Sequence, residues 1–190
     1  MPLNVPIILT WVRIVLIPLL VALYYLPDQL LGAYARDVLA TGTFVVAALT
    51  DWLDGWLARR LNQTSAFGAF LDPVADKLMV SAALLVLLNF GRVDALIALV
   101  IIGREITISA LREWMAQIGA RTSVAVHWLG KVKTVAQMIA IPCLLYGHTV
   151  FDVVDTRWWG SRLIEIAAIL TVWSMMYYLR RAWPAIKNST

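Results

Sequence analysis

Long runs of apolar residues alternate with short polar segments along the whole chain. Each run approaches the roughly 20 residues that a helix needs to cross a lipid bilayer, once flanking residues and tilt are included. The pattern therefore predicts six membrane-spanning helices. They are Val5 to Leu26, Val38 to Leu57, Val74 to Phe90, Ala95 to Leu111, Val132 to Tyr146 and Leu163 to Tyr178.

The composition agrees with a membrane protein. Hydrophobic residues make up 61% of the 190 positions, charged residues make up only 15%, and the mean hydropathy is +0.77. No internal repeat, low-complexity tract or long linker divides the chain, so we expect residues 1–190 to form one domain. The predicted fold class is an all-α integral membrane protein with its six helices in one bundle.

The net charge of +4 matters mainly through its position along the chain, and a nucleic-acid partner is not expected. Basic residues predominate in alternate connecting segments. Because cytoplasmic segments of membrane proteins are enriched in Lys and Arg, we expect these segments, together with both termini, to face the cytoplasm. The predicted cytoplasmic residues are Arg59, Arg60, Lys77, Arg104, Arg112, Arg121, Lys131, Lys133, Arg180, Arg181 and Lys187.

The opposite, outward-facing segments carry fewer basic residues and several acidic ones. Arg92 and Asp37 belong to this outward set. Trp158, Trp159 and Gly160 are expected in an outward loop, because aromatic and turn residues are common at the boundary between lipid and water. His127 and His148 lack a second histidine at metal-ligand spacing, so both are expected to have ordinary interfacial roles.

Four aspartates lie at the predicted cytoplasmic edges of the second and third apolar runs. In helices, Asp51 and Asp54 are three residues apart and Asp72 and Asp76 are four apart, so each pair shares one face of its helix. The segment 60–71 is expected to form a tight turn that folds the third helix back against the second. Two pairs of carboxylates then converge, and their repulsion requires a cation.

Hard divalent cations meet this requirement, because Mg²⁺ and Mn²⁺ prefer carboxylate oxygens. Four carboxylates are enough to hold two ions, as in two-metal sites for phosphoryl transfer. Gly55, Ala58 and Gly68 leave space for a base and a pyrophosphate, and Arg59 can meet a phosphate or ribose oxygen. Alternatively, the aspartates are interfacial residues that pair with nearby cations: Arg59, Arg60 and Lys77.

These residues follow a fixed spacing, Asp51-x-x-Asp54-Gly55-x-x-Ala58-Arg59 and then Gly68-x-x-x-Asp72-x-x-x-Asp76. The spacing resembles the signature of the CDP-alcohol phosphotransferase family at every defined position. The resemblance implies a six-helix membrane enzyme, usually a homodimer, that transfers a phosphatidyl or similar group from a CDP-linked donor to an alcohol. It assigns two divalent ions, Mg²⁺ or Mn²⁺, to the four aspartates and makes Asp76 the general base. It places four residues around the cytidine and the pyrophosphate: Gly55, Ala58, Arg59 and Gly68.

Four further stretches resemble bacterial members of this family that use sn-glycerol 3-phosphate as the acceptor: residues 4–18, 62–77, 104–116 and 123–138. The resemblance implies CDP-diacylglycerol as the donor, phosphatidylglycerophosphate and CMP as products, and a site on the cytoplasmic side of the bacterial inner membrane. Asn4, Thr10 and Arg13 are expected near the head group of the lipid donor.

The phosphate of this acceptor is a dianion and calls for cations near the aspartates. The candidates on the cytoplasmic side are Arg104, Arg112, Lys131 and Lys133. Arg104 and Arg112 are eight residues apart and therefore near one helical face, and Glu105 is expected to orient one of the cations. In the alternative interpretation, these residues only follow the charge bias of cytoplasmic segments or contact anionic lipid head groups.

Two other functions are compatible with parts of this pattern. The same chemistry can use another alcohol, such as inositol phosphate or serine. An ion-coupled transporter is the more distant alternative, because acids and bases within a membrane also mark ion pathways. A transporter of this kind is expected to place its charges near the bilayer midplane in related halves, whereas these charges cluster toward one face and no repeat is visible.

Overall fold

The computed structural model describes residues 5–60, 66–117 and 128–187. The described residues form six α-helices: α1 (Val5–Leu23), α2 (Ala33–Arg60), α3 (Ala66–Asn89), α4 (Ala95–Gln117), α5 (Trp128–Tyr146) and α6 (Thr156–Lys187). A short antiparallel hairpin, β1 (Thr149–Val150) and β2 (Val154–Asp155), joins α5 to α6. The all-α prediction is confirmed, since each predicted apolar run falls on one helix, but the hairpin was not expected.

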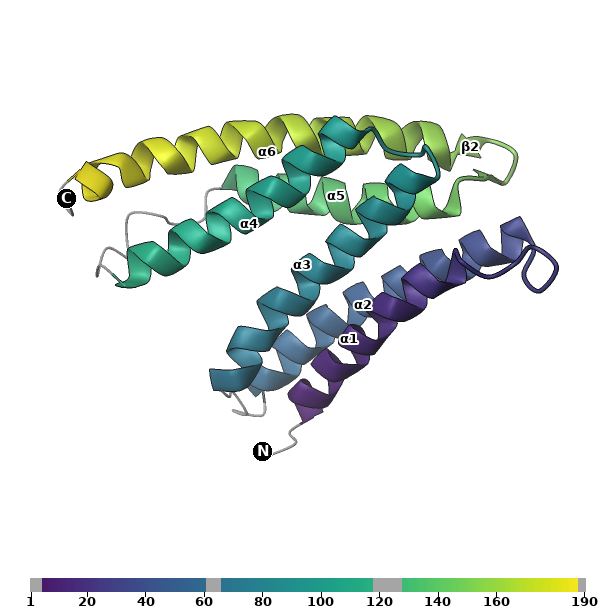
Figure 1. Ribbon diagram of the computed structural model, residues 1–190, viewed down its shortest axis with the longest axis horizontal. Coiled ribbons are helices and arrows are strands. Elements are labelled where there is room, and N and C mark those ends of the chain that lie inside the picture. Colours follow the sequence, from purple (N-terminus) through teal and green to yellow (C-terminus); the bar gives the residue numbers. More distant parts are fainter. Residues whose placement is uncertain (1–4, 61–65, 118–127, 188–190) are drawn as a thin grey trace.

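The helices pack in two groups of three (Figure 1). In one group, α6 packs along α5 and also contacts α4; in the other, α1 packs against both α2 and α3. Contacts of α2 with α5 and of α3 with α4 join the groups. Because α2 and α3 contact each other less than either contacts α1, the expectation that α3 folds directly back on α2 is only partly correct. The N-terminal helix is the main partner of both.

Two segments expected to be turns are helical. The helix α3 already begins at Ala66, so residues 66–71 of the predicted turn are helical, whereas residues 61–65 of this segment lie outside the described chain. Trp158, Trp159 and Gly160 lie in the first turns of α6 instead of a loop. The carboxylate of Asp155 accepts hydrogen bonds from the backbone N–H groups of Arg157 and Trp158, at 2.9 and 3.1 Å. Asp155 therefore acts as an N-cap, which explains why α6 begins here.

The bundle is apolar outside and partly polar inside. Large exposed apolar side chains occur on all six helices, among them Val15, Leu49, Leu85, Leu99, Val135 and Ile169. The buried polar or charged side chains include Arg13, Asp37, Asp54, Arg104, Lys133 and Gln137. Large apolar patches are uncommon on water-soluble monomers, whereas charged residues of membrane-embedded helices face the bundle interior. This distribution is typical of a protein surrounded by lipid.

Length and hydropathy alone identify fewer spanning helices than predicted. In the described parts of the chain, one helical stretch, Thr156–Arg180, is long and apolar enough to cross a membrane. Ile7–Leu23 and Val132–Tyr146 are apolar but shorter. The helices α2, α3 and α4 carry the aspartates and arginines discussed above, which lower their hydropathy. Six membrane spans therefore stay a prediction.

One end of the bundle depends on the turn that follows α3. Gly91 adopts a φ of +63° there, and the backbone N–H groups of Gly91 and Arg92 donate to carbonyls in the last turn of α3, at 3.0 and 2.8 Å. This helix-ending motif requires a left-handed residue, which favours glycine. The motif directs the chain so that Arg92 reaches the C-terminal end of α5.

Arg92 links this turn to two other helices. Its guanidinium donates to two carbonyls at the end of α5, at 2.6 and 3.1 Å, and to the carboxylate of Asp37 in α2, at 2.6 Å. Asp37 is only 1% exposed, and it also contacts His148 Nε2 at 3.2 Å and the hydroxyl of Tyr24 at 3.3 Å. We call these four residues the Asp37 cluster. Asp37 and Arg92, both expected on the outward side, form an ion pair in which Asp37 is buried and the Arg92 side chain is 15% exposed. Neither charge is stable in the bundle without a partner.

Candidate active site

The four motif aspartates lie at the end of α2 and α3 that is opposite the Asp37 cluster. Asp51 and Asp54 are near the C-terminal end of α2, whereas Asp72 and Asp76 are near the N-terminal end of α3. The predicted convergence is confirmed, because both pairs contact the same short stretch of α1. The residue that brings them together is Arg13.

Arg13 contacts three of the carboxylates at once. Its Nη1 atom lies 3.1 Å from Asp51 Oδ1 and 2.8 Å from Asp76 Oδ1, and its Nη2 atom lies 2.5 Å from Asp54 Oδ2. The side chain is 1% exposed. A buried guanidinium in this position satisfies carboxylates that otherwise repel one another.

Thr10 completes the group from one helical turn earlier in α1. Its hydroxyl donates a hydrogen bond of 2.6 Å to Asp72 Oδ1. Thr10 and Arg13 are three residues apart and so lie on the same face of α1. We call Thr10, Arg13 and the four aspartates the Arg13 cluster. The expected position of Thr10 and Arg13 near the head group of the lipid donor stays a prediction, whereas their direct contact with the motif aspartates is an additional finding.

The Arg13 cluster fits divalent metal ions in its chemistry. The cluster holds four carboxylates and one guanidinium, and hard carboxylate and hydroxyl oxygens are ligands that Mg²⁺ and Mn²⁺ prefer. Within the described ranges, however, no three His, Cys, Asp or Glu side chains are arranged to hold a metal ion. The guanidinium of Arg13 lies among these carboxylates and contacts three of them.

The pairing of the aspartates with Arg59, Arg60 and Lys77 stays an alternative interpretation. The guanidinium of Arg60 lies over the ring of Trp56, 4.8 Å from its centre. Lys77 lines the same pocket as Asp51 and Asp76. The side chains of Ala58 and Arg59 are outside the described part of the structure, although both residues belong to α2.

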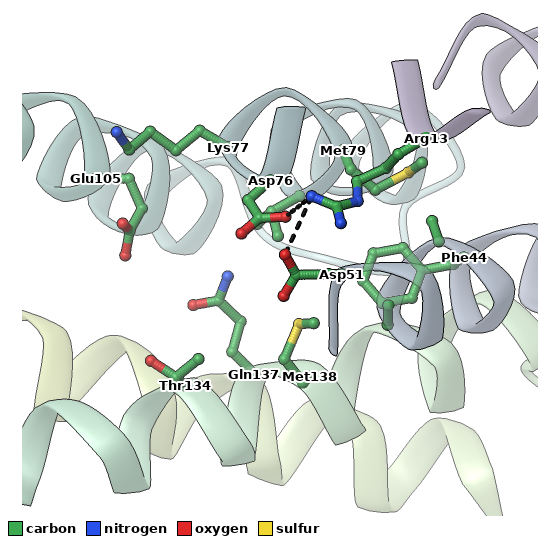
Figure 2. Close-up of a pocket in the computed structure, with 13 residues that line it drawn as sticks. Arg13, Phe44, Asp51, Asp76, Lys77, Met79, Glu105, Thr134, Gln137 and Met138 are labelled. Carbon is green, nitrogen blue, oxygen red and sulfur yellow. Dashed lines mark hydrogen bonds and ion pairs between the residues drawn. The ribbon is translucent and has the colours of Figure 1, made fainter. Parts of the chain in front are cut away.

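A pocket of about 190 Å³ opens beside Arg13 (Figure 2). Asp51 and Asp76 line this pocket, and their side chains are 38% and 46% exposed, whereas Asp54 is 3% exposed. Thr134 and Gln137 of α5 line it as well. Asp51 and Asp76 are therefore the motif carboxylates that a molecule in the pocket can reach.

Glu105 of α4 lines the same pocket and pairs with two buried cations. Its Oε1 atom lies 2.5 Å from Lys133 Nζ and 3.0 Å from Arg104 Nη1. Lys133 is 2% exposed and Arg104 is 6% exposed. The expectation that Glu105 orients a cation is confirmed, and the structure shows that it contacts two.

The other two cations predicted for the acceptor are Arg112 and Lys131. The guanidinium carbons of Arg104 and Arg112 each lie 5.8 Å from the ring centre of Tyr178 in α6, so the two arginines share a face of α4 as predicted. Arg112 is exposed. Lys131 belongs to α5, but its side chain lies outside the described residues, as do Asn4 and His127.

The two motif glycines lie next to the carboxylates on their helices. Gly55 follows Asp54 directly, and Gly68 precedes Asp72 by one helical turn and is buried. Small residues at these positions reduce side-chain bulk around the Arg13 cluster.

The sequence contains one indication of the role of Arg13. It is an ionisable residue inside an otherwise apolar run, and in a membrane protein such a residue is by itself an indication of function. The expectation for Arg13 gave this indication too little weight.

Comparison with known proteins shows the family to which the chain belongs. Residues 3–178 match the sequence model of CDP-alcohol phosphatidyltransferases, and the chain belongs to this family, as the motif predicted. Two similar proteins, from Salmonella choleraesuis (strain SC-B67) and Escherichia coli (strain K12), are 49% and 47% identical to it. Each similarity extends over 184 residues, which cover 96% of both chains. Both relatives are named CDP-diacylglycerol–glycerol-3-phosphate 3-phosphatidyltransferase.

Proposed function

We propose that the protein transfers the phosphatidyl group of CDP-diacylglycerol to sn-glycerol 3-phosphate, which yields phosphatidylglycerophosphate and CMP. The observation that carries this proposal is that one pocket is lined both by the motif carboxylates and by Glu105, which pairs with Lys133 and Arg104. This arrangement supports a site for a metal-bound pyrophosphate next to a site for an anionic acceptor. The near full-length similarity to two enzymes named for this reaction supports the choice of acceptor.

The carboxylates of the Arg13 cluster are proposed to hold two divalent cations, Mg²⁺ or Mn²⁺. The ligands would be Asp51, Asp54, Asp72 and Asp76. Such ions, when bound, neutralise the pyrophosphate and stabilise the charge of the departing nucleotide. Arg13 and Thr10 hold the four carboxylates in one place before substrate arrives. The cytidine and the pyrophosphate would lie against Gly55, Ala58, Arg59 and Gly68.

Asp76 is the proposed general base, because it lines the pocket and is 46% exposed. Its carboxylate takes the proton of the primary hydroxyl of the acceptor. The hydroxyl oxygen forms a bond to the phosphorus that carries diacylglycerol, and the bond from this phosphorus to the oxygen of CMP breaks. CMP leaves with the electron pair of the broken bond.

The phosphate of the acceptor is proposed to bind cations of α4 and α5. Lys133 and Arg104 are the central pair, because both are buried and both contact a residue that lines the pocket. A Lys ammonium and an Arg guanidinium form short, charge-assisted hydrogen bonds with phosphate oxygens. Arg112 and Lys131 would add positive charge at the margin of this site.

The membrane arrangement is also part of the proposal. We infer that residues 1–190 form a single domain whose six helices span the inner (plasma) membrane of a bacterium, with both termini and the aspartates on the cytoplasmic side. The apolar outer surface of all six helices and the distribution of basic residues support this topology. The acyl chains of the donor would stay in the bilayer, and the enzyme would act as a homodimer.

An acceptor comparison with purified protein tests the function. CDP-diacylglycerol is supplied with sn-glycerol 3-phosphate, inositol phosphate or serine, and the release of CMP is measured with and without a chelator. We expect release only with sn-glycerol 3-phosphate, loss of release with the chelator, and recovery with Mg²⁺ or Mn²⁺. Release with one of the other alcohols would reject the acceptor, and release that persists in the chelator would reject the metals. Ion flux into vesicles without CMP release would instead indicate a transporter.

A further inference from the structure

Glu105 is placed between the pocket and the two buried cations of the proposed acceptor site. The carboxylate lines the pocket, and its Oε1 atom alone contacts both Lys133 Nζ and Arg104 Nη1, at 2.5 and 3.0 Å. Figure 2 shows this side chain on the opposite side of Asp76 from Arg13. A molecule in the pocket therefore meets the carboxylate of Glu105 before it meets either cation.

The carboxylate makes the contacts that a phosphate group would make. Carboxylate and phosphate oxygens accept the same charge-assisted hydrogen bonds from Lys and Arg. Lys133 and Arg104 are 2% and 6% exposed, and two buried cations without an anion would repel each other and be poorly solvated. Glu105 therefore stabilises the empty site.

The same carboxylate opposes binding of the substrate. Asp51 and Asp76 line the pocket together with Arg13 and Lys77, and Glu105 adds a further negative charge on the route of a phosphate dianion to Lys133 and Arg104. With Glu105 in place, Lys133 and Arg104 together present only one net positive charge. A phosphate can use both cations only when the carboxylate releases them.

We propose that Glu105 is an internal ligand that holds Lys133 and Arg104 between turnovers and is displaced by the phosphate of the acceptor. This inference rests on the proposed function. An uncharged alcohol cannot replace the Glu105 carboxylate as the partner of Lys133 and Arg104, whereas a phosphate dianion can. This exchange therefore favours phosphorylated acceptors. The product keeps this phosphate, and the return of Glu105 to the cations assists its release.

Glu105→Gln in the full-length protein tests the proposal. The amide oxygen still accepts hydrogen bonds from Lys133 and Arg104, but the competing charge is gone. We expect KM for sn-glycerol 3-phosphate to fall by roughly tenfold or more, as for the loss of one competing contact to a charged group. The inhibition constant of inorganic phosphate should fall by a similar factor, and kcat should not rise because product release becomes slower.

Glu113→Gln is the matched control, because Glu113 is an exposed glutamate on the same helix. This variant should leave KM and the phosphate inhibition constant unchanged. A rise or no change of both constants in Glu105→Gln would overturn the proposal and leave Glu105 as a residue that positions the cations or binds the acceptor. If Glu105→Gln does not fold, Glu105→Asp provides the test, because its shorter side chain keeps the charge but holds the cations less closely. A smaller fall of both constants is expected there, and a rise or no change rejects the proposal.

The wild-type protein separates this inference from the proposed function. If it releases no CMP with sn-glycerol 3-phosphate, the proposed function fails. If it releases CMP normally and the two constants of Glu105→Gln do not fall, only the role of Glu105 fails.

Discussion

The two ends of α2 carry opposite arrangements of charge. In the Asp37 cluster, one buried carboxylate is surrounded by hydrogen-bonding groups of Arg92, His148 and Tyr24. In the Arg13 cluster, one buried guanidinium is surrounded by carboxylates. The first cluster is a balanced ion pair with additional hydrogen bonds, whereas the second keeps an excess of negative charge.

This difference separates a structural role from a functional one. A balanced, hydrogen-bonded pair needs no further ligand, and it joins α2 to the turn after α3 and to the end of α5. Unbalanced carboxylates repel one another and lower stability unless a cation binds. The chain therefore accepts a local loss of stability at the end where the reaction is proposed to occur, as is common at active sites.

The largest expected effect is the loss of activity in Asp76→Asn. If Asp76 is the general base, the rate of CMP release should fall by roughly 10²- to 10⁴-fold. The metal-free variant should be at least as stable as the wild type, because one of several repelling charges is removed. CMP release and thermal unfolding in detergent measure the two quantities.

Asp152→Asn is the control for this variant, because Asp152 is exposed in the hairpin and has a φ of +54°, which asparagine tolerates. Asp152→Asn should change neither the rate of CMP release nor the thermal unfolding. Near-normal turnover in Asp76→Asn would contradict the assignment of the base.

A smaller effect, on stability alone, is expected for Arg92→Met. The change leaves the carboxylate of Asp37 buried without its cation and removes the hydrogen bonds to the end of α5, so the free energy of unfolding should fall by about 3–5 kcal/mol. The activity of the folded fraction should stay at the wild-type level. Reversible unfolding in detergent, together with CMP release per folded molecule, checks both expectations.

Two further variants sharpen this test of the Asp37 cluster. Adding Asp37→Asn to Arg92→Met should restore part of the lost stability, because no unpaired charge is then left. Arg157→Met changes an exposed arginine near the start of α6 and should alter stability by less than about 0.5 kcal/mol. Equal stability of Arg92→Met and Arg157→Met would mean that the buried pair contributes nothing.

The smallest expected effect concerns Gly147, which lies next to the side chain of Arg92. Gly147 has a φ of +63°, and a Cβ atom there would lie 3.1 Å from Arg92 Nη1. Gly147→Ala should therefore lower the free energy of unfolding by about 1–2 kcal/mol, mostly through the left-handed backbone. Gly42→Ala is the control, because a Cβ atom at Gly42 meets nothing within 4 Å; an equal loss in both variants would refute the special role of Gly147.

Sequence patterns predicted the aspartates of the Arg13 cluster well and the pairing in the Asp37 cluster poorly. The motif spacing identified four aspartates, and their convergence is confirmed because residues three and four apart share a helical face. Arg92 and Asp37 looked like polar residues of outward segments, because no local pattern relates two residues 55 positions apart. Their pairing depends on the turn at Gly91 and on the packing of α2 beside α5.

Hydropathy and spacing along a single helix were enough to predict the helical runs, the family and the residues proposed to carry the chemistry. The packing of the helices was needed to show that Arg13 of α1 contacts the aspartates, that Asp51 and Asp76 line the pocket, and that Glu105 pairs with Lys133 and Arg104. The reason is physical: helical periodicity is a local property of the backbone, whereas the choice of neighbouring helices results from the packing and charge pairing of the whole bundle.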